Sequence, residues 1–280
     1  MDPAEINLRI VPLRNVILHE DDDPARVTRI MAALQMDGVL RHPPIATEAF
    51  AEASREPCYI VLDGATRITA LRRLGYRDAL VQIVDYASSQ VSLNAWYHLL
   101  EGISGEGLLD QIRKIEGVQA QRMDGHHAES ALATRAILCM IALRDRSIWG
   151  VRAEGDLSAQ TEKLNRVVDL YRGYADLFRV VTTDLDLLLN EYPNFSALVV
   201  FPSYQPAEVI HLALNNSKVP MGITRHLIDG RTLNVNLDLQ MLATDDSLEK
   251  KNAWLKQWLS DKVHARKVRF YGEPVFVFED

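Results

Sequence analysis

The stretch LDGATR, residues 62–67, decides the fold of the first part of the chain. The apolar run at residues 59–62 leads into it, and apolar side chains at helical spacing follow it as far as Gly75. Such a pattern predicts a buried strand, a tight turn and a helix. Because the first N–H groups of a helix have no partner within the helix and attract negative charge, the turn is a candidate anion-binding site.

The side chains of this turn suit phosphate in particular. Gly64 allows a ligand to approach the backbone, Thr66 offers a hydroxyl donor, and Arg67 offers a guanidinium group for phosphate oxygens. A purely structural interpretation is equally open at this point. In that interpretation Asp63 caps the helix and Arg67 lies on its solvated face.

Elements on both sides of the turn extend this unit. Asp23 followed by Pro24 predicts the start of another helix, and Gly38 predicts its end. Two further strands are expected at residues 6–10 and 80–84. Together these elements predict a compact α/β unit that covers residues 1–90.

The remainder of the chain, residues 91–280, predicts a second α/β lobe. Trp96 is expected in an apolar helix that begins the connection to this lobe. Further elements follow from apolar and β-branched patterns: a hairpin at residues 137–149, a long amphipathic helix at 164–178, a strand at 198–201, a helix from Pro206, a helix around 254–259 and a final strand at 275–278.

Composition narrows the class of protein. The 280 residues are 48% hydrophobic, enough for one large domain or two ordinary ones, and their formal net charge is -7. A negative chain lacks a general attraction for polyanions, so nucleic-acid binding is disfavoured. No signal peptide and no run of about 18 apolar residues is recognised, which predicts a cytoplasmic protein that does not cross a membrane. Cys58 and Cys139 have neither zinc-site nor redox-pair spacing.

The turn LDGATR, continuing into ALRRLGY at residues 70–76, resembles the nucleotide-binding turn of the ParB/sulfiredoxin superfamily. Sulfiredoxins need a catalytic cysteine inside this turn, where the present chain has Ala65 and Thr66. ParB partition proteins carry an arginine-rich turn followed by a helix-turn-helix, and neither is recognisable in this acidic sequence. Two branches of the superfamily are therefore disfavoured.

The free serine kinases, with their siderophore-pathway relatives, are the branch that the chain resembles most. Their acidic entry and first helix are similar to residues 19–27 and 37–43, and their substrate-side aromatic segment to WYH at 96–98. Their C-terminal signature is similar to GITRHLI at residues 222–228 with Arg231. The resemblance implies a ParB/sulfiredoxin-like nucleotide-binding lobe, residues 1–90, and a second α/β lobe, residues 91–280, that completes the active site.

The resemblance also implies an activity: transfer of a phosphoryl group from ATP or ADP, with Mg²⁺, to the hydroxyl of free L-serine, giving O-phospho-L-serine for cysteine or siderophore synthesis. The choice of donor nucleotide, the metal ligands and the oligomeric state stay open. Family turns carry histidines after the glycine, and Thr66 is expected to replace them as a neutral phosphate donor.

Roles for individual residues follow from the resemblance. Glu20 is the expected general base, because the three aspartates after it disfavour further negative charge nearby and so favour a carboxylate that takes up a proton. The alternative is that residues 20–23 only complement the positive end of the next helix. Asp63 is expected to position the hydroxyl or to hold magnesium. The expected nucleotide contacts are Gly64, Ala65, Thr66, Arg67, Thr224, Arg225, His226 and Arg231, and the expected substrate contacts are His19, His42, Trp96 and His98.

Two other functions remain as alternatives. One is a ParB-like regulator that binds nucleotide and DNA without turnover, and the other is a catalytically silent homologue. Glu20, together with the donors expected from the second lobe, favours the kinase.

Overall fold

The computed structural model describes residues 6–51 and 56–271, and its contacts divide the chain into two compact units. Unit 1 comprises the described parts of Met1–Leu18, Asp22–Ser92 and Leu227–Asp280. Unit 2 comprises His19–Asp21 and Leu93–His226. The mixture of helices and sheets confirms the predicted α+β class.

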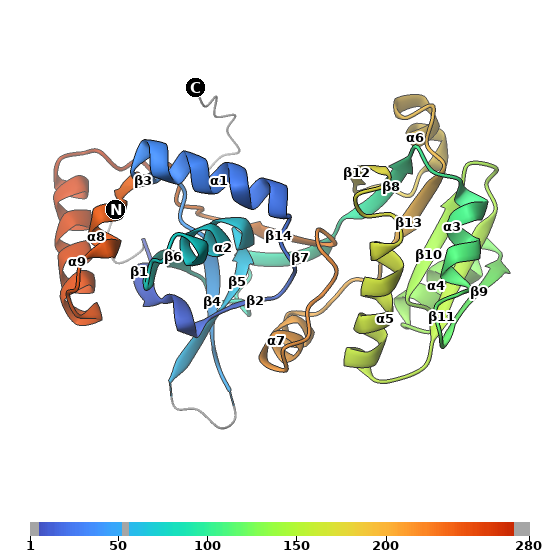
Figure 1. Ribbon diagram of the computed structural model, residues 1–280, viewed down its shortest axis with the longest axis horizontal. Coiled ribbons are helices and arrows are strands. Elements are labelled where there is room, and N and C mark those ends of the chain that lie inside the picture. Colours follow the sequence, from blue (N-terminus) through green and yellow to red (C-terminus); the bar gives the residue numbers. More distant parts are fainter. Residues whose placement is uncertain (1–5, 52–55, 272–280) are drawn as a thin grey trace. The chain divides into compact units, whose positions relative to one another are not determined.

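Unit 1 is built on a five-stranded mixed sheet (Figure 1). Its strand order is β1 (Leu8–Pro12), β6 (Asp78–Ile83), β4 (Ile45–Phe50), β5 (Pro57–Asp63) and β2 (Val16–Leu18). The pairs β2 with β5 and β4 with β6 are parallel, whereas β1 with β6 and β4 with β5 are antiparallel. Helices α1 (Pro24–Asp37) and α2 (Ala65–Arg73) pack against each other and share the core with the sheet.

Helix α1 begins and ends where the sequence predicts, because both of its caps are local. The Asp23 side chain accepts a hydrogen bond of 2.8 Å from the Ala25 amide, and Pro24 occupies the first turn, where its missing N–H costs nothing. Gly38 ends the helix in the left-handed conformation, with φ of 67°.

The C-terminal part of the chain returns to unit 1, so the units do not follow the expected boundary of residues 1–90 and 91–280. Strand β15 (Leu237–Asp238) pairs with β3 (Val39–Leu40), and α8 (Leu239–Ala243) and α9 (Leu248–His264) follow. Helix α9 packs on β1, and its Leu255 and Leu259 belong to the core of unit 1. The core of the first lobe therefore needs apolar side chains from the opposite end of the sequence.

Polar groups as well as apolar side chains hold α9 in place. Asn252 exchanges hydrogen bonds of 2.9 and 2.8 Å with the amide and carbonyl of Ile10. The buried Lys251 ammonium donates to Asp78 at 2.7 Å and to the Leu242 carbonyl at 2.9 Å. A buried ammonium group needs such partners, because burial without them costs several kcal/mol.

Unit 2 is built on a six-stranded sheet whose pairs are all antiparallel. Its strand order is β12 (Asp176–Val180), β8 (Tyr97–Glu101), β13 (Ala197–Val200), β10 (Cys139–Leu143), β11 (Ile148–Ala153) and β9 (Val118–Met123). The helices of this unit are α3 (Gly105–Ile112), α4 (Gly125–Ala133), α5 (Leu157–Asp169), α6 (Leu185–Glu191) and α7 (Pro206–Leu214) (Figure 1). The predicted hairpin, now β10 and β11, and the predicted helix at Pro206 are both confirmed.

Two predictions for unit 2 are wrong. The expected long helix at residues 164–178 ends at Asp169, and Phe178 lies in β12. Trp96 lies between β7 (Val91–Ala95) and β8 rather than in an apolar helix. In both cases pairing with a distant strand decides the structure: β12 pairs with β8, and β7 pairs with β14 (Thr224–Ile228).

The final strand expected at residues 275–278 lies outside the described residues. Over the described ranges, no helix has both the length and the apolar character needed to cross a membrane.

Candidate active site

The turn after β5 has the predicted strand-turn-helix form, and its glycine lies at the start of α2. Gly64, with φ of 94°, is the N-cap of α2, and no side chain makes a capping hydrogen bond there. Asp63 is therefore not the cap. A Cβ atom at Gly64 would lie 2.8 Å from Nη2 of Arg67, so the missing side chain makes room for the arginine, and the expected nucleotide contact of Gly64 stays a prediction.

Arg67 folds back over the turn instead of lying on a solvated helix face. Its guanidinium donates to the Asp63 carboxylate at 3.0 Å and to the His42 carbonyl at 2.8 Å. Burial lowers the pKa of Arg67 from its ordinary value, and the ion pair with Asp63 opposes this effect. The positive charge of Arg231 lowers the same pKa, which places a second cation nearby.

These residues line a pocket of about 230 Å³ in unit 1, called the arginine pocket below. Its lining consists of His42, Pro43, Ile45, Asp63, Arg67, Arg231, Thr232 and Leu233. The volume leaves room for several water molecules or for a small anionic group. The pocket thus combines room for an anion with two guanidinium groups.

Arg231 is the main correction to the expected site. The sequence groups it with Thr224, Arg225 and His226 as a donor from the second lobe, but it belongs to unit 1. Its guanidinium lies 3.5 Å from the Asp63 carboxylate. Ala65 and Thr66 lie in the first turn of α2, outside the pocket lining, and their expected phosphate contacts stay predictions.

Glu20 lies at the centre of a second group of residues, in unit 2. Its carboxylate accepts hydrogen bonds from the Gly222 amide at 3.0 Å and from the Thr224 hydroxyl at 3.4 Å. The Thr224 oxygen lies 2.9 Å from Nε2 of the buried His19, whose ring meets the edge of the His226 ring at 5.3 Å. These five residues form the glutamate cluster. It holds a half-buried carboxylate in one orientation, as a general base requires.

The three aspartates after Glu20 make separate contacts. Asp21 pairs with Lys218 at 2.9 Å, Asp22 accepts a hydrogen bond from Thr69, and Asp23 caps α1. Residues 21–23 thus have structural partners, whereas Glu20 is the carboxylate held by the loop that precedes β14.

The aromatic segment lies beside this cluster within unit 2. The Trp96 amide donates to the Ile223 carbonyl at 2.8 Å, next to Gly222. The Arg225 guanidinium lies 4.7 Å from the centre of the Trp96 ring, a cation–π contact that orients both side chains.

His98 lies in the core of unit 2, and its expected substrate contact stays a prediction. It is 1% exposed, and its ring nitrogens lie 2.8 Å from the Tyr171 hydroxyl and 3.3 Å from the Gly222 carbonyl. Burial lowers its pKa to about 4, so the ring is neutral at physiological pH. His98 is a core residue of β8 that supports the Gly222 backbone.

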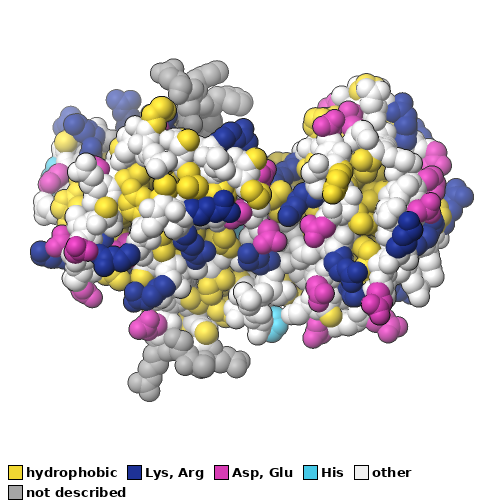
Figure 2. Space-filling view, viewed as in Figure 1, with side chains coloured by type: hydrophobic (Ala, Val, Ile, Leu, Met, Phe, Trp, Pro, Cys, Tyr) yellow, Lys and Arg dark blue, Asp and Glu magenta, His cyan; other side chains and the backbone are white. Residues whose placement is uncertain are grey.

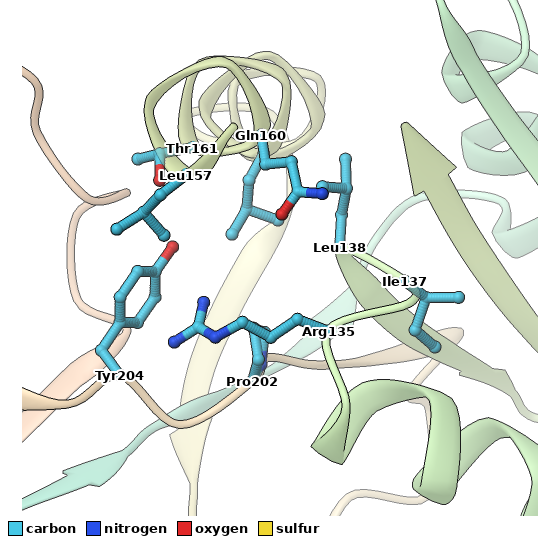
Figure 3. A pocket seen from close by; sticks show the side chains of 9 residues that line it. Arg135, Ile137, Leu138, Leu157, Gln160, Thr161, Pro202 and Tyr204 are labelled. Atoms are coloured by element: carbon cyan, nitrogen blue, oxygen red, sulfur yellow. The ribbon is translucent and has the colours of Figure 1, made fainter. Parts of the chain in front are cut away.

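A smaller cavity in unit 2 has a structural role. Figure 3 shows Arg135, Gln160 and Tyr204 around it, and its volume of about 10 Å³ holds no more than a single water molecule. Arg135 lies 4.6 Å from the centre of the Tyr204 ring and bonds to Glu208 at 2.6 Å in the first turn of α7. The contacts fix the start of that helix.

Charged side chains of both signs share the visible surface (Figure 2). On the face in Figure 2, Lys and Arg side chains are interspersed with Asp and Glu, without a continuous basic patch. Across residues 6–51 and 56–271, no group of three or more His, Cys, Asp or Glu side chains is arranged to hold a metal ion.

Arg179 is a residue near the glutamate cluster that the sequence analysis missed. A Cβ atom at Gly222 would lie 2.6 Å from Cζ of Arg179, so the guanidinium rests against that glycine. The sequence pattern assigns residue 179 to no site, because its position depends on the pairing of β12 with β8.

Comparisons with known proteins extend over both units. The chain is 28% identical, over 284 residues and the full length of both proteins, to the ATP-dependent L-serine kinase SbnI of Staphylococcus aureus (strain NCTC 8325 / PS 47). It is 30% identical over 116 residues, 41% of this chain and 44% of the relative, to the ATP-dependent L-serine kinase of Staphylothermus marinus. No family model matches the chain.

Solved structures share the fold. SbnI with a C-terminal truncation, from Staphylococcus aureus, matches with a TM-score of 0.72 and 24% identity over 94% of this chain and 100% of that chain. A free serine kinase in complex with AMP matches with a TM-score of 0.71 and 17% identity over 85% and 94%. The relatives named ATP-dependent L-serine kinases confirm the resemblance to the free serine kinases, and the solved structures show the shared fold.

Proposed function

We propose that this chain phosphorylates the hydroxyl of free L-serine with ATP to give O-phospho-L-serine and ADP. The observation that carries the proposal is the Glu20 carboxylate, held by the Gly222 amide and the Thr224 hydroxyl. Two relatives, one of them similar over its full length, are named ATP-dependent L-serine kinases. The nucleotide complex of a structural neighbour supports the same assignment.

Glu20 acts as the general base in this reaction. The serine hydroxyl oxygen attacks the γ-phosphorus of ATP, the bond from that phosphorus to the β,γ-bridging oxygen breaks, and the hydroxyl proton passes to Glu20. The two hydrogen bonds to the carboxylate fix its direction before the substrate binds. Trp96, oriented by Arg225, is assigned to shield the reacting groups from water.

The arginine pocket binds the phosphate groups of the nucleotide. Arg67 and Arg231 both contact the Asp63 carboxylate, so their positive charges are placed before the anion arrives. Mg²⁺ prefers one or two carboxylates together with substrate phosphates, and Asp63 fits as the protein ligand in such an arrangement. The metal would supply charge neutralisation on the phosphate oxygens.

Phosphorus NMR of the protein with L-serine, Mg²⁺ and nucleotide tests the reaction. We expect an O-phosphoserine resonance with ATP, accompanied by ADP, and no such resonance when L-serine is omitted. The same measurement with ADP identifies whether the diphosphate also serves as a donor. Nucleotide loss without phosphoserine would refute the proposed function.

Replacing Arg231 by Ala is expected to weaken ATP binding about 10- to 100-fold, because a charge-assisted contact to phosphate contributes about 1.5–3 kcal/mol. Arg231 suits this test better than Arg67, since Arg67 also fastens the turn to the His42 carbonyl. Isothermal titration calorimetry measures the change directly.

Arg73→Ala is the matched control for this prediction. Arg73 is an exposed arginine at the end of α2, outside the lining of the arginine pocket, and its loss should leave ATP affinity unchanged. If the Arg231→Ala and Arg73→Ala variants bind ATP with equal affinity, the arginine pocket does not bind the phosphate groups.

A further inference from the structure

Gly222 has charged groups of opposite sign beside it. Its amide donates to the Glu20 carboxylate at 3.0 Å, and a Cβ atom on its α-carbon would lie 2.6 Å from both Cζ and Nε of Arg179. Its φ of 76° also favours glycine. A side chain at position 222 would therefore displace the Arg179 guanidinium from its place beside Gly222.

The register of the sheet brings Arg179 to this place. Arg179 on β12 is directly opposite His98 on β8, and directly opposed residues in antiparallel strands project from the same face of a sheet. His98 in turn lies 3.3 Å from the Gly222 carbonyl and is held by Tyr171. The positive charge of Arg179 also contributes to the lowered pKa of His98, although burial is the larger cause.

Arg179 differs from Arg225 in its exposure and setting. The Arg225 guanidinium lies over the Trp96 ring, whereas Arg179 is an exposed residue of the edge strand β12. Its planar group is suited to paired hydrogen bonds with a carboxylate. Glu20 and Arg179 are thus a base and a cation on either side of one small residue.

A free hydroxy amino acid carries groups complementary to both side chains: a hydroxyl for the base and a carboxylate for the cation. In L-serine, two carbon atoms separate the hydroxyl oxygen from the carboxylate carbon. A carboxylate bound to Arg179 brings the hydroxyl towards Glu20, and such fixed positioning of a reacting group lowers the barrier to its reaction. A hydroxyl compound without the carboxylate lacks this anchor.

We propose that Arg179 binds the α-carboxylate of the amino-acid substrate and thereby selects free amino acids over other alcohols. This assignment rests on the proposed serine kinase function and adds its specificity-determining residue.

The experiment compares L-serine with L-serinamide, in which a neutral amide replaces the carboxylate, in the parent protein and in Arg179→Ala. For L-serine, kcat/KM should fall about 10- to 100-fold in the variant, mainly through KM, as expected for the loss of a charge-assisted contact. For L-serinamide, kcat/KM should hardly change. The preference of the parent protein for L-serine over L-serinamide should therefore collapse in Arg179→Ala.

Arg122→Ala is the matched control, because Arg122 is an exposed arginine on β9, the opposite edge strand of the same sheet. It should keep the parental preference. Arg179→Lys should recover only part of the preference, because lysine restores the positive charge but not the planar guanidinium that makes two hydrogen bonds to one carboxylate. Circular dichroism and the affinity for ATP should match the parent protein in all three variants.

The outcomes separate this inference from the proposed function. A parent protein that makes no phosphoserine contradicts the proposed function itself. An active parent whose preference survives in Arg179→Ala overturns only the role of Arg179. A fall in kcat that is equal for L-serine and L-serinamide also overturns it, because this result assigns Arg179 to the phosphoryl group.

Discussion

Glu20→Gln is expected to lower the turnover of L-serine by roughly 100-fold or more, because the amide cannot take the hydroxyl proton. The amide oxygen of glutamine still accepts hydrogen bonds from the Gly222 amide and the Thr224 hydroxyl, so the side chain keeps its place. Affinity for ATP should remain within about twofold of the parent value. The measurements are the rate of phosphoserine formation and calorimetric titration with ATP.

Glu129→Gln controls for the loss of one negative charge, because Glu129 is an exposed residue of α4. Its rate should equal that of the parent protein. Phosphoserine formation by Glu20→Gln at a near-parental rate would show that another group accepts the proton. The glutamate cluster would then serve to bind and not to catalyse.

Lys251→Met is expected to destabilise unit 1 by about 3–5 kcal/mol, because the Asp78 carboxylate would lose its buried ion-pair partner. Lys251 is 1% exposed and Asp78 is 8% exposed, so water cannot readily replace the missing ammonium group. Urea unfolding followed by the fluorescence of Trp254 and Trp258 on α9 reports on this unit. Replacing Trp96 and Trp149 by Phe in every variant removes the signal of unit 2.

Two further variants decide whether the ion pair is the cause. Lys250→Met removes the neighbouring exposed lysine, which pairs with Asp246, and should leave the urea midpoint nearly unchanged. Combining Lys251→Met with Asp78→Leu removes both charges and should recover much of the lost stability. If the single Lys251→Met variant unfolds at the parental midpoint, the buried pair does not hold α9 in place.

Elements with local signals could be predicted from the sequence. Helix α1 has its cap at Asp23 and its stop at Gly38, and the turn at Gly64 lies between a strand and a helix that both have regular apolar patterns. Strand β12 has no comparable signal, since it follows α5 closely and its pairing with β8 decides its conformation. Local patterns therefore favoured a helix through Phe178.

The residues of the candidate site likewise fall into those that local motifs predict and those that distant contacts place. Glu20 and Arg67 could be proposed from their motifs, and the structure gives each of them fixed partners. Arg231 belongs to unit 1 because the C-terminal segment returns to that unit. The position of Arg179 depends on the register between β12 and β8. Neither property leaves a pattern among neighbouring residues, because each arises from contacts between distant parts of the sequence.

The return of the C-terminal segment also sets an order for folding during synthesis. Residues 93–226, nearly all of unit 2, are continuous in the sequence, whereas the core of unit 1 needs Leu255 and Leu259 of α9. Domains generally fold from the N-terminus as the ribosome releases them. Here the unit that begins first should finish last, once α9 is available. A nascent chain that stops before residue 227 lacks both α9 and Arg231, so premature termination yields no product with a complete arginine pocket.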